Sequence, residues 1–213
     1  MAEADMGAAL TEVRSAEELR SILGEVASTT AHKVRRELHA LDRAWLAASP
    51  FCLVATADAA GNCDVSPKGD PPGFVHVLDD RTLVLPERPG NRRGDGFHNL
   101  LDNPHVGLLF FVPGRGDTLR INGKARILRD APFFDALTVK GHRPVLAILV
   151  AVEEVFYHCS KAFLRSSLWE PSEWQPDALP SRAEFAKALE KPDFTLKELE
   201  EYYGETYREK LYR

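Results

Sequence analysis

The stretch from His105 to Leu128, HVGLLFFVPGRGDTLRINGKARIL, decides the fold class. It contains two runs rich in β-branched, aromatic and leucine residues, 105–112 and 118–128, separated by a turn-forming cluster at 113–117. Runs of this kind, bounded by glycine, proline and aspartate, are typical of neighbouring antiparallel strands. Within the second run, Asn122-Gly123 indicates either the tip of a hairpin or a bulge in one long strand. The residues alone leave both alternatives open.

Further strand-like runs lie on both sides of this stretch, and turn clusters such as Asp58–Asn62 separate them. The full set of runs is 51–57, 73–78, 81–86, 105–112, 118–128 and 146–159. So many short runs at close spacing are typical of a closed or nearly closed antiparallel sheet. The sequence therefore predicts a mainly β protein with flanking helices, built on an antiparallel barrel of six or seven strands.

Two helices are expected before the strands. Ser15 and Glu18 form a capping box, and Gly24 ends the helix that follows. A second helix is expected over 30–48, because apolar residues recur there at helical spacing and Ser49-Pro50 disfavours its continuation. Its expected inward-facing residues are Val34, Leu38, Leu41 and Trp45, and its expected outward-facing residues are Lys33, Arg35, Arg36 and Asp42.

One short helix is expected among the strands. Phe97, Leu100 and Leu101 follow Asp95 at helical spacing, and Asp95 is the expected N-cap.

Capping boxes at 181–184 and 195–198 predict two further helices near the end of the chain, and prolines keep these pieces short. We therefore divide the chain into an N-terminal helical extension (1–49), a barrel domain (50–160) and a C-terminal helical extension (161–213). The C-terminal extension is expected to pack on the barrel or on a partner subunit.

The composition is that of a soluble globular protein. At 213 residues the chain is long enough for one well-cored domain with appendages. Its hydrophobic fraction of 44% and charged fraction of 28% are ordinary, and no segment has the ~20 apolar residues of a membrane span. Acidic residues stand where a secretory signal would carry basic ones, so a cytoplasmic location is expected. The net charge of -5 disfavours nucleic-acid binding.

The cysteines and histidines show no metal or disulfide pattern. Three cysteines without a Cys-x-x-Cys spacing are expected to be buried thiols, and the histidines lack His-x-x-x-His or His-Glu-x-x-His spacing. No metal site is therefore expected. Cys159 follows His158 directly, but adjacent strand residues point to opposite faces, so a catalytic pair is disfavoured and a structural role is expected.

The segment Leu85–Pro104 gathers basic residues on a glycine-rich loop between a strand and a helix. Arg88, Arg92 and Arg93 can offer charge-assisted hydrogen bonds, and the start of a helix adds backbone N–H donors. This combination suits a phosphate monoester. The alternative is a solvated loop whose arginines pair with the nearby acids, which are Glu87, Asp95 and Asp102.

Several stretches taken in order resemble the FMN-binding split-barrel family related to pyridoxamine 5'-phosphate oxidase. The family pattern Asn-Pro-x-Val-x-Leu-Leu-Phe matches from Asn103, and x-Gly-x-Ala matches at 122–125. SPKGDPPGFV, LPERPGNRRGD, TLRINGKARI and FYHCSKAFLRSSLWEP are similar to a bacterial subgroup of FMN-dependent enzymes within this superfamily. The chain lacks the C-terminal Trp-Gln and Arg-Leu-His motif of the oxidase itself, so oxidation of B6 vitamers is not expected.

The resemblance implies a homodimer of split barrels with FMN at the subunit interface. It places the FMN phosphate near Arg88, Asn91, Arg92, Arg93 and Lys68. It places the flavin ring along the strand formed by Val65, Ser66, Pro67 and Lys68, beside Leu85 and Pro86, and near the strand that carries Thr118 and Arg120. Lys161 and Arg165 share a helical face and could complete an anionic pocket, or form a solvated basic face. Trp169 is expected to be a core or interface anchor near the same site.

The function implied by the resemblance is that of an FMN-dependent oxidoreductase. The flavin carries the electrons, and the protein supplies binding, orientation and electrostatics to a small-molecule substrate, for which NAD(P)H is one candidate. The alternative is a non-catalytic module that binds, stores or senses FMN, haem or a deazaflavin.

Overall fold

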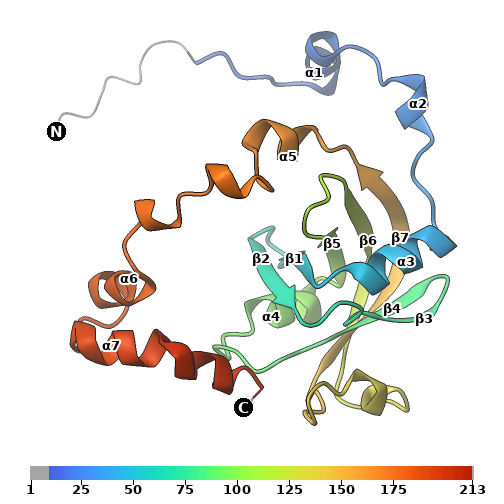
Figure 1. Ribbon diagram of the computed structural model, residues 1–213. Coiled ribbons are helices and arrows are strands. Elements are labelled where there is room, and N and C mark those ends of the chain that lie inside the picture. Colours follow the sequence, from blue (N-terminus) through green and yellow to red (C-terminus); the bar gives the residue numbers. More distant parts are fainter. Residues whose placement is uncertain (1–9, 213) are drawn as a thin grey trace. The chain divides into compact units, whose positions relative to one another are not determined.

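A computed structural model describes residues 10–212, except for the side chains of residues 29, 31, 206, 208 and 210. Within them, one seven-stranded antiparallel sheet has the strand order β2-β1-β5-β6-β7-β4-β3 (Figure 1). The strands are β1 (Phe51–Ala57), β2 (Cys63–Gly69), β3 (His76–Asp79), β4 (Thr82–Pro86), β5 (His105–Phe111), β6 (Thr118–Leu128) and β7 (Ala147–His158). The predicted mainly β split barrel with flanking helices is confirmed. The first nine residues and the last residue of the predicted extensions lie outside the described residues.

Alternation along the strands builds the core of the barrel. In β1, Cys52, Val54 and Thr56 are buried, whereas the residues between them are partly or well exposed. β5 and the first half of β6 repeat the pattern, with Phe110 and Ile121 fully buried. Because successive side chains of a strand point to opposite faces, one face of the curled sheet becomes the apolar interior.

β6 is one continuous strand, so the interpretation of Asn122-Gly123 as a hairpin tip is wrong and that of a long strand with an irregularity is confirmed. The register between β6 and β7 shifts at these two residues, and Glu153 of β7 is the extra residue. A single extra residue in one strand of an antiparallel pair is a β-bulge, which increases the local twist.

The short helix α4 (Asp95–Asp102) lies between β4 and β5 in the chain and packs on β1, β2 and β6 (Figure 1). Its N-cap is Gly94 and not the expected Asp95, because Gly94 adopts a left-handed backbone with φ of 72°. Leu100 is the buried residue of the helix, whereas Leu101 is exposed.

The expected helix over 30–48 is wrong in its first half. The structure has a short α2 (Ser28–Ala31) and a separate α3 (Ala40–Ala48). Between them, the backbone of Arg35 exchanges hydrogen bonds of 3.0 and 2.8 Å with Val155 of β7, and a helix cannot make this pairing. Tertiary pairing therefore overrides the apolar spacing, and two of the expected inward residues, Val34 and Leu41, are exposed.

Asp42, expected on the outer face, is buried at the start of α3. The Arg35 guanidinium donates two hydrogen bonds to its carboxylate, one of them 2.9 Å long, and the backbone N–H of His39 donates another of 2.7 Å. Burial alone would raise the pKa of the Asp42 carboxyl, but these hydrogen bonds outweigh burial and lower the pKa. The stabilisation that this carboxylate adds is present above its unfolded pKa of about 4 and is lost as the pH falls through the lower folded value.

Within the described residues, 10–34 belong to one compact unit, and α3 belongs with the barrel to a second unit that starts at Arg35. In the first unit, α1 (Ala16–Leu23) is confirmed with Ser15 as its N-cap and Gly24 after its end, but the predicted capping box is incomplete, because the Glu18 carboxylate accepts from the backbone N–H of Arg14 and not from that of Ser15. The Ser15 side chain accepts the Glu18 N–H at 3.0 Å, and Gly24 follows with φ of 75°.

The chain beyond the barrel is helical, as predicted. Its helices are α5 (Lys161–Ser166), α6 (Arg182–Leu189) and α7 (Leu196–Tyr203), and short 3₁₀ turns occur there at Pro171–Glu173, Pro176–Ala178 and Glu205–Lys210. A further 3₁₀ turn, Phe134–Leu137, lies between β6 and β7. Both predicted capping boxes, Ser181 with Glu184 and Thr195 with Glu198, are present. α6 and α7 pack on each other through a small buried cluster around Leu199. Among residues 10–212, no helix has both the length and the hydrophobicity that crossing a membrane would require.

Replacing Gly123 with alanine tests the packing at the bulge. An added Cβ would lie 2.0 Å from the carbonyl oxygen of Ala151, a backbone atom that cannot swing away. We expect Gly123→Ala to lower the free energy of unfolding by ~3 kcal/mol, as measured by urea denaturation. Gly90→Ala is the matched control, because the nearest atom to its Cβ, the Arg88 carbonyl oxygen, would be 4.0 Å away. A Gly123→Ala variant as stable as the parent would contradict the packing described here.

Candidate functional site

A groove of about 360 Å³ is lined on one side by the edge strand β2 and on the other by the loop that follows β4. The β2 side consists of Ser66–Gly69 and continues with Asp70 and Phe74. The opposite side consists of Pro86–Asn91. The groove thus brings together these residues predicted from the sequence: Ser66, Pro67, Lys68, Pro86, Arg88 and Asn91.

Two ion pairs of opposite polarity join the two sides of the groove. Lys68 of β2 pairs with Glu87, and Asp70, just after β2, pairs with Arg88 at 2.5 Å between Oδ2 and Nε. The Asp70 side chain is only 1% exposed and the Arg88 side chain 14%. β2 and β4 are not neighbours in the sheet, so these side chains join the β2 side of the groove to the loop after β4 where no backbone ladder does. Their four charges cancel within the groove.

Arg88 ties three segments together. Besides the Asp70 carboxylate, its guanidinium donates 2.8 Å from Nη2 to the carbonyl oxygen of Leu137 and 3.4 Å from Nη1 to that of His142. All three guanidinium nitrogens therefore have protein acceptors. Arg88, predicted as a phosphate ligand, thus also holds the loop to the β6–β7 connection.

Successive side chains of β2 point to opposite faces, so the residues of this strand that were predicted to lie along the flavin fall into two sets. Ser66 and Lys68 also line a hollow of about 30 Å³ against α4, room for about one water, where the Lys68 ammonium lies 5.4 Å from the Phe97 ring centroid. The Ser66 hydroxyl donates a 2.9 Å hydrogen bond to Asp64. Val65, next along the strand, is 58% exposed and lines neither hollow.

Asn91, Arg92 and Arg93 lead from the groove into α4. The Arg93 backbone N–H donates to the Asn91 side-chain oxygen at 3.0 Å, and its guanidinium donates to Asp95 at 2.8 Å. Arg92 has a left-handed backbone with φ of 63°, which is uncommon for a residue with a side chain. In the described part of the chain, Arg92 has no ion-pair partner, so its charge is available to a ligand.

The other predicted residues lie elsewhere in the fold. The Leu85 side chain is 1% exposed and belongs to the core. Thr118 is buried at the start of β6 and faces His158 of β7, which immediately precedes the α5 region. Thr118 belongs to a second group of predicted residues, which lies on β6 and in the α5 region. The other members of this group are Arg120, Lys161, Arg165 and Trp169. In the strand order, β1 and β5 separate β6 from β2, so one chain does not bring this group to the groove through neighbouring strands.

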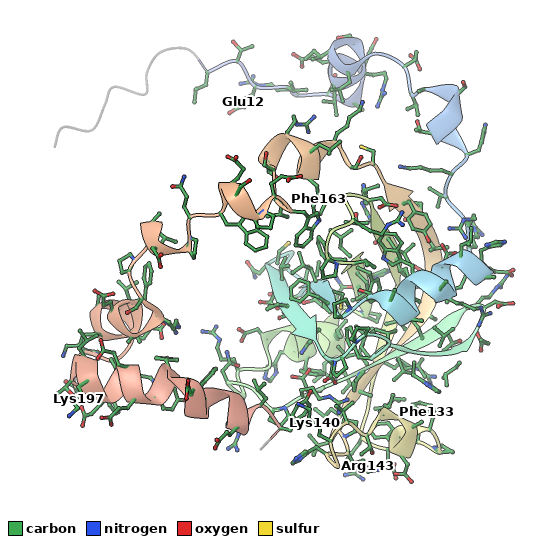
Figure 2. The ribbon with its side chains drawn as sticks, viewed as in Figure 1. Glu12, Phe133, Lys140, Arg143, Phe163 and Lys197 are labelled. Atoms are coloured by element: carbon green, nitrogen blue, oxygen red, sulfur yellow. The ribbon has the colours of Figure 1, made fainter. Side chains whose placement is uncertain are left out.

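Trp169 behaves as the anchor that the sequence indicates. Its indole N–H donates 2.7 Å to the carbonyl oxygen of Arg115, and its ring stacks on Phe163 of α5 with centroids 6.0 Å apart. Phe163, labelled in Figure 2, also contacts the Phe111 ring at the end of β5. Arg120 instead forms a 3.2 Å hydrogen bond to Asn122 on its own strand.

The cysteines are only partly as expected. Cys52 is buried, and desolvation raises the pKa of its thiol to about 12, so it stays neutral. Cys63 and Cys159, expected to be buried, are exposed. Cys63 begins the edge strand β2, which has a neighbouring strand on one side only, and Cys159 follows the end of β7. No group of histidine, cysteine, aspartate and glutamate within residues 10–212 is arranged to hold a metal ion.

Sequence reasoning missed Asp70 and misjudged the partner of Glu87. Of the acids expected to neutralise the arginines, Asp95 pairs with Arg93, but Glu87 pairs with Lys68. Both pairs across the groove join residues about twenty positions apart in the chain, and local patterns carry no signal for such pairing. The only available hint was charge complementarity between Lys68-x-Asp70 and Glu87-Arg88.

Glu87→Gln tests whether the groove is held neutral by this pairing. The change keeps the side-chain shape but leaves the Lys68 ammonium without its counter-charge, so an anion in the groove should bind more strongly. We expect the affinity for inorganic phosphate, measured by calorimetry at low ionic strength, to rise roughly fivefold. Asp102→Asn, an exposed acid at the end of α4, is the matched control and should change this affinity little. An unchanged affinity in Glu87→Gln would show that the charge of Lys68 does not act on the groove.

Comparison with solved structures finds partial likenesses of low identity. HupZ of Group A Streptococcus is 21% identical, with 56% of this chain and 93% of that chain covered and a TM-score of 0.46. A candidate pyridoxamine 5'-phosphate oxidase of Lactobacillus delbrueckii is 25% identical, covering 57% and 95%, with a TM-score of 0.45. An FMN-binding protein of Syntrophomonas wolfei is 12% identical, covering 56% and 89%, with a TM-score of 0.42. Among curated proteins, none matches the sequence.

The comparison with family models gives the assignment. The model described as pyridoxamine 5'-phosphate oxidase matches residues 38–159, which include α3, all seven strands, α4 and both sides of the groove. This match covers more than half of the chain and agrees with the resemblance stated from the sequence motifs. The chain therefore belongs to the pyridoxamine 5'-phosphate oxidase family.

Proposed function

We propose that the groove between β2 and the β4–α4 loop binds FMN, and that the chain is an FMN-dependent oxidoreductase acting on a small molecule. The observation that carries this proposal is the groove itself. It lies inside the segment that matches the family, and it gathers the β2 residues and the loop residues into one hollow of a size common for ligand sites.

The groove suits a planar ring with polar edges. Pro67, Phe74, Pro86 and Pro89 supply apolar surface, and Ser66 and Asn91 supply polar groups. β2 is an edge strand, so one side of its backbone does not pair with another strand and can offer N–H and C=O groups to the ring.

The loop beyond the groove suits a phosphate. Arg92 carries an available charge, and Arg93 shares its guanidinium with Asp95. α4 has eight residues, and its N-cap residue, Gly94, has no side chain, so no side-chain oxygen caps the N–H groups of its first turn. We therefore assign the phosphate to Arg92, Arg93 and the start of α4, with Asn91 as a neutral donor.

Bound FMN would supply hydride or electron transfer between the substrate and an acceptor, with NAD(P)H as a candidate electron donor. The chain's own residues would bind and orient. Lys68 and Ser66 hold the polar edge of the ring, and the Lys68–Glu87 pair keeps the groove close to neutral. A neutral groove gives the negative charge of a reduced flavin little stabilisation, which favours a low reduction potential.

We further propose that the chain acts as a homodimer. Lys161, Arg165 and Trp169, with Thr118 and Arg120, form a group apart from the groove in the strand order. A two-fold arrangement could bring this group of one subunit to the groove of the other. The family resemblance is what supports this arrangement.

One observation favours a second candidate, a non-catalytic module that binds or stores FMN or a related cofactor. Each titratable group that lines the groove already has a partner of opposite charge, because Lys68 pairs with Glu87 and Asp70 with Arg88. A site of this kind holds a ligand without offering an unpaired acid or base. The two candidates share the flavin and differ in turnover.

Flavin binding is tested by titrating the purified protein with FMN and with riboflavin and following flavin fluorescence. Arg92→Ala should weaken FMN roughly tenfold and riboflavin little, because only FMN carries the phosphate. Arg93→Ala is the matched comparison and should weaken FMN less, since Asp95 already shares that charge. A protein that takes up no FMN, or equal losses for both ligands, would overturn this assignment.

Turnover is then tested by mixing the FMN-loaded protein with NADPH or NADH without oxygen. Rapid bleaching of the flavin absorbance, followed by recovery in air, is expected of the oxidoreductase. A loaded protein that stays yellow with these donors and with other organic reductants would favour the storage candidate.

A further inference from the structure

Tyr212, which follows the last 3₁₀ turn, contacts the wall of the groove. The phenol of Tyr212 donates a 2.5 Å hydrogen bond to Oδ1 of Asp70, whose other oxygen accepts from Arg88. Asp70 therefore joins the two-sided groove to the C-terminal segment. Tyr212 does not line the hollow but contacts two of the residues that do.

The Tyr212 ring is held on more than one side. It stacks on His142 with centroids 5.7 Å apart and an interplanar angle of 21°, and the Arg88 guanidinium lies 6.0 Å from its centroid. The ammonium of Lys140 lies 5.4 Å from the same ring. Lys140 belongs to the β6–β7 connection, as Figure 2 shows. Cations over an aromatic face attract it, so these contacts favour one position of the ring.

The hydrogen bond persists at neutral pH. The hydrogen bond to Asp70 is the largest effect that raises the pKa of the Tyr212 phenol above its usual value, and burial and the negative charge of Asp70 act in the same direction. The charge of Arg88 acts in the opposite direction. The phenol therefore stays a donor. Asp70, with its side chain 1% exposed, has little access to water that could replace this donor.

We propose that Tyr212 is a positioning residue of the groove, which orients the Asp70–Arg88 pair and thereby sets the affinity of the β4–α4 loop for an anionic ligand. Arg88 precedes Asn91, Arg92 and Arg93 by three to five residues, so its orientation restricts where that loop can place its donors. In this way the C-terminal segment, which lies outside the matched family region, becomes part of the ligand site. The inference takes its ligand, FMN, from the proposed function. The contacts of Tyr212 that support it do not depend on that function.

The test compares Tyr212→Phe with the parent. The variant keeps the ring and its stacking but removes the donor to Asp70. Tyr207→Phe is the matched control, because the Tyr207 ring packs on Tyr202 and Tyr203 of α7 instead. We expect Tyr212→Phe to raise the dissociation constant for FMN about tenfold and that for riboflavin less than twofold, and to lower the urea unfolding midpoint, because the buried Asp70 carboxylate loses a donor. Tyr207→Phe should change neither constant.

A ligand-free measurement separates this inference from the proposed function. The backbone N–H of Glu87 donates 2.9 Å to the Leu146 carbonyl oxygen and reports on the loop beside Arg88. Its hydrogen exchange should be at least threefold faster in Tyr212→Phe and unchanged in Tyr207→Phe. If the parent binds no FMN but exchange accelerates in this way, the flavin proposal fails and the positioning role stands. Unchanged exchange, or equal weakening of FMN and riboflavin, would overturn the positioning role.

Discussion

The buried ion pair between Asp70 and Arg88 is the interaction on which the candidate site depends. The edge strands of the sheet are β2 and β3, and no backbone ladder joins β2 to β4. Asp70–Arg88, together with Lys68–Glu87, joins the two sides of the groove with side chains. Removing both members of such a pair from water costs several kcal/mol, which good geometry and additional hydrogen bonds can offset. Arg88 has these bonds to Leu137 and His142, and Asp70 has one from Tyr212.

The opposite polarity of the two pairs has a consequence for ligand binding. Each side of the groove carries one positive and one negative group, so the groove is neutral although the loop beside it is rich in arginine. The charge that remains for an anion lies beyond the groove, at Arg92 and at the start of α4. We therefore see the site as two parts, a neutral hollow that suits a ring and a basic turn that suits a phosphate. This division suits the proposed ligand, FMN, which has a planar ring and a charged phosphate.

The sequence predicted the barrel well because its signals are local. β1 and β6 match the predicted runs at both ends, since alternation and turn residues act within a few positions. The helix over 30–48 was wrong because Arg35 pairs with Val155, more than one hundred residues away. The same reason explains the site. The loop arginines and β2 were found from motifs, but Asp70, the partner of Glu87 and the role of Tyr212 depend on contacts between distant segments, which periodicity does not encode.

The account is tested most directly by a double-mutant cycle on the Asp70–Arg88 pair, which joins the two sides of the groove. The free energy of unfolding is measured by urea denaturation for the parent, Asp70→Asn, Arg88→Gln and the double variant. If the pair joins β2 to the loop as described, the two substitutions are coupled by about 2 kcal/mol or more, and each single variant is markedly less stable than the parent. Additive effects, with a coupling energy below about 0.5 kcal/mol, would contradict the account.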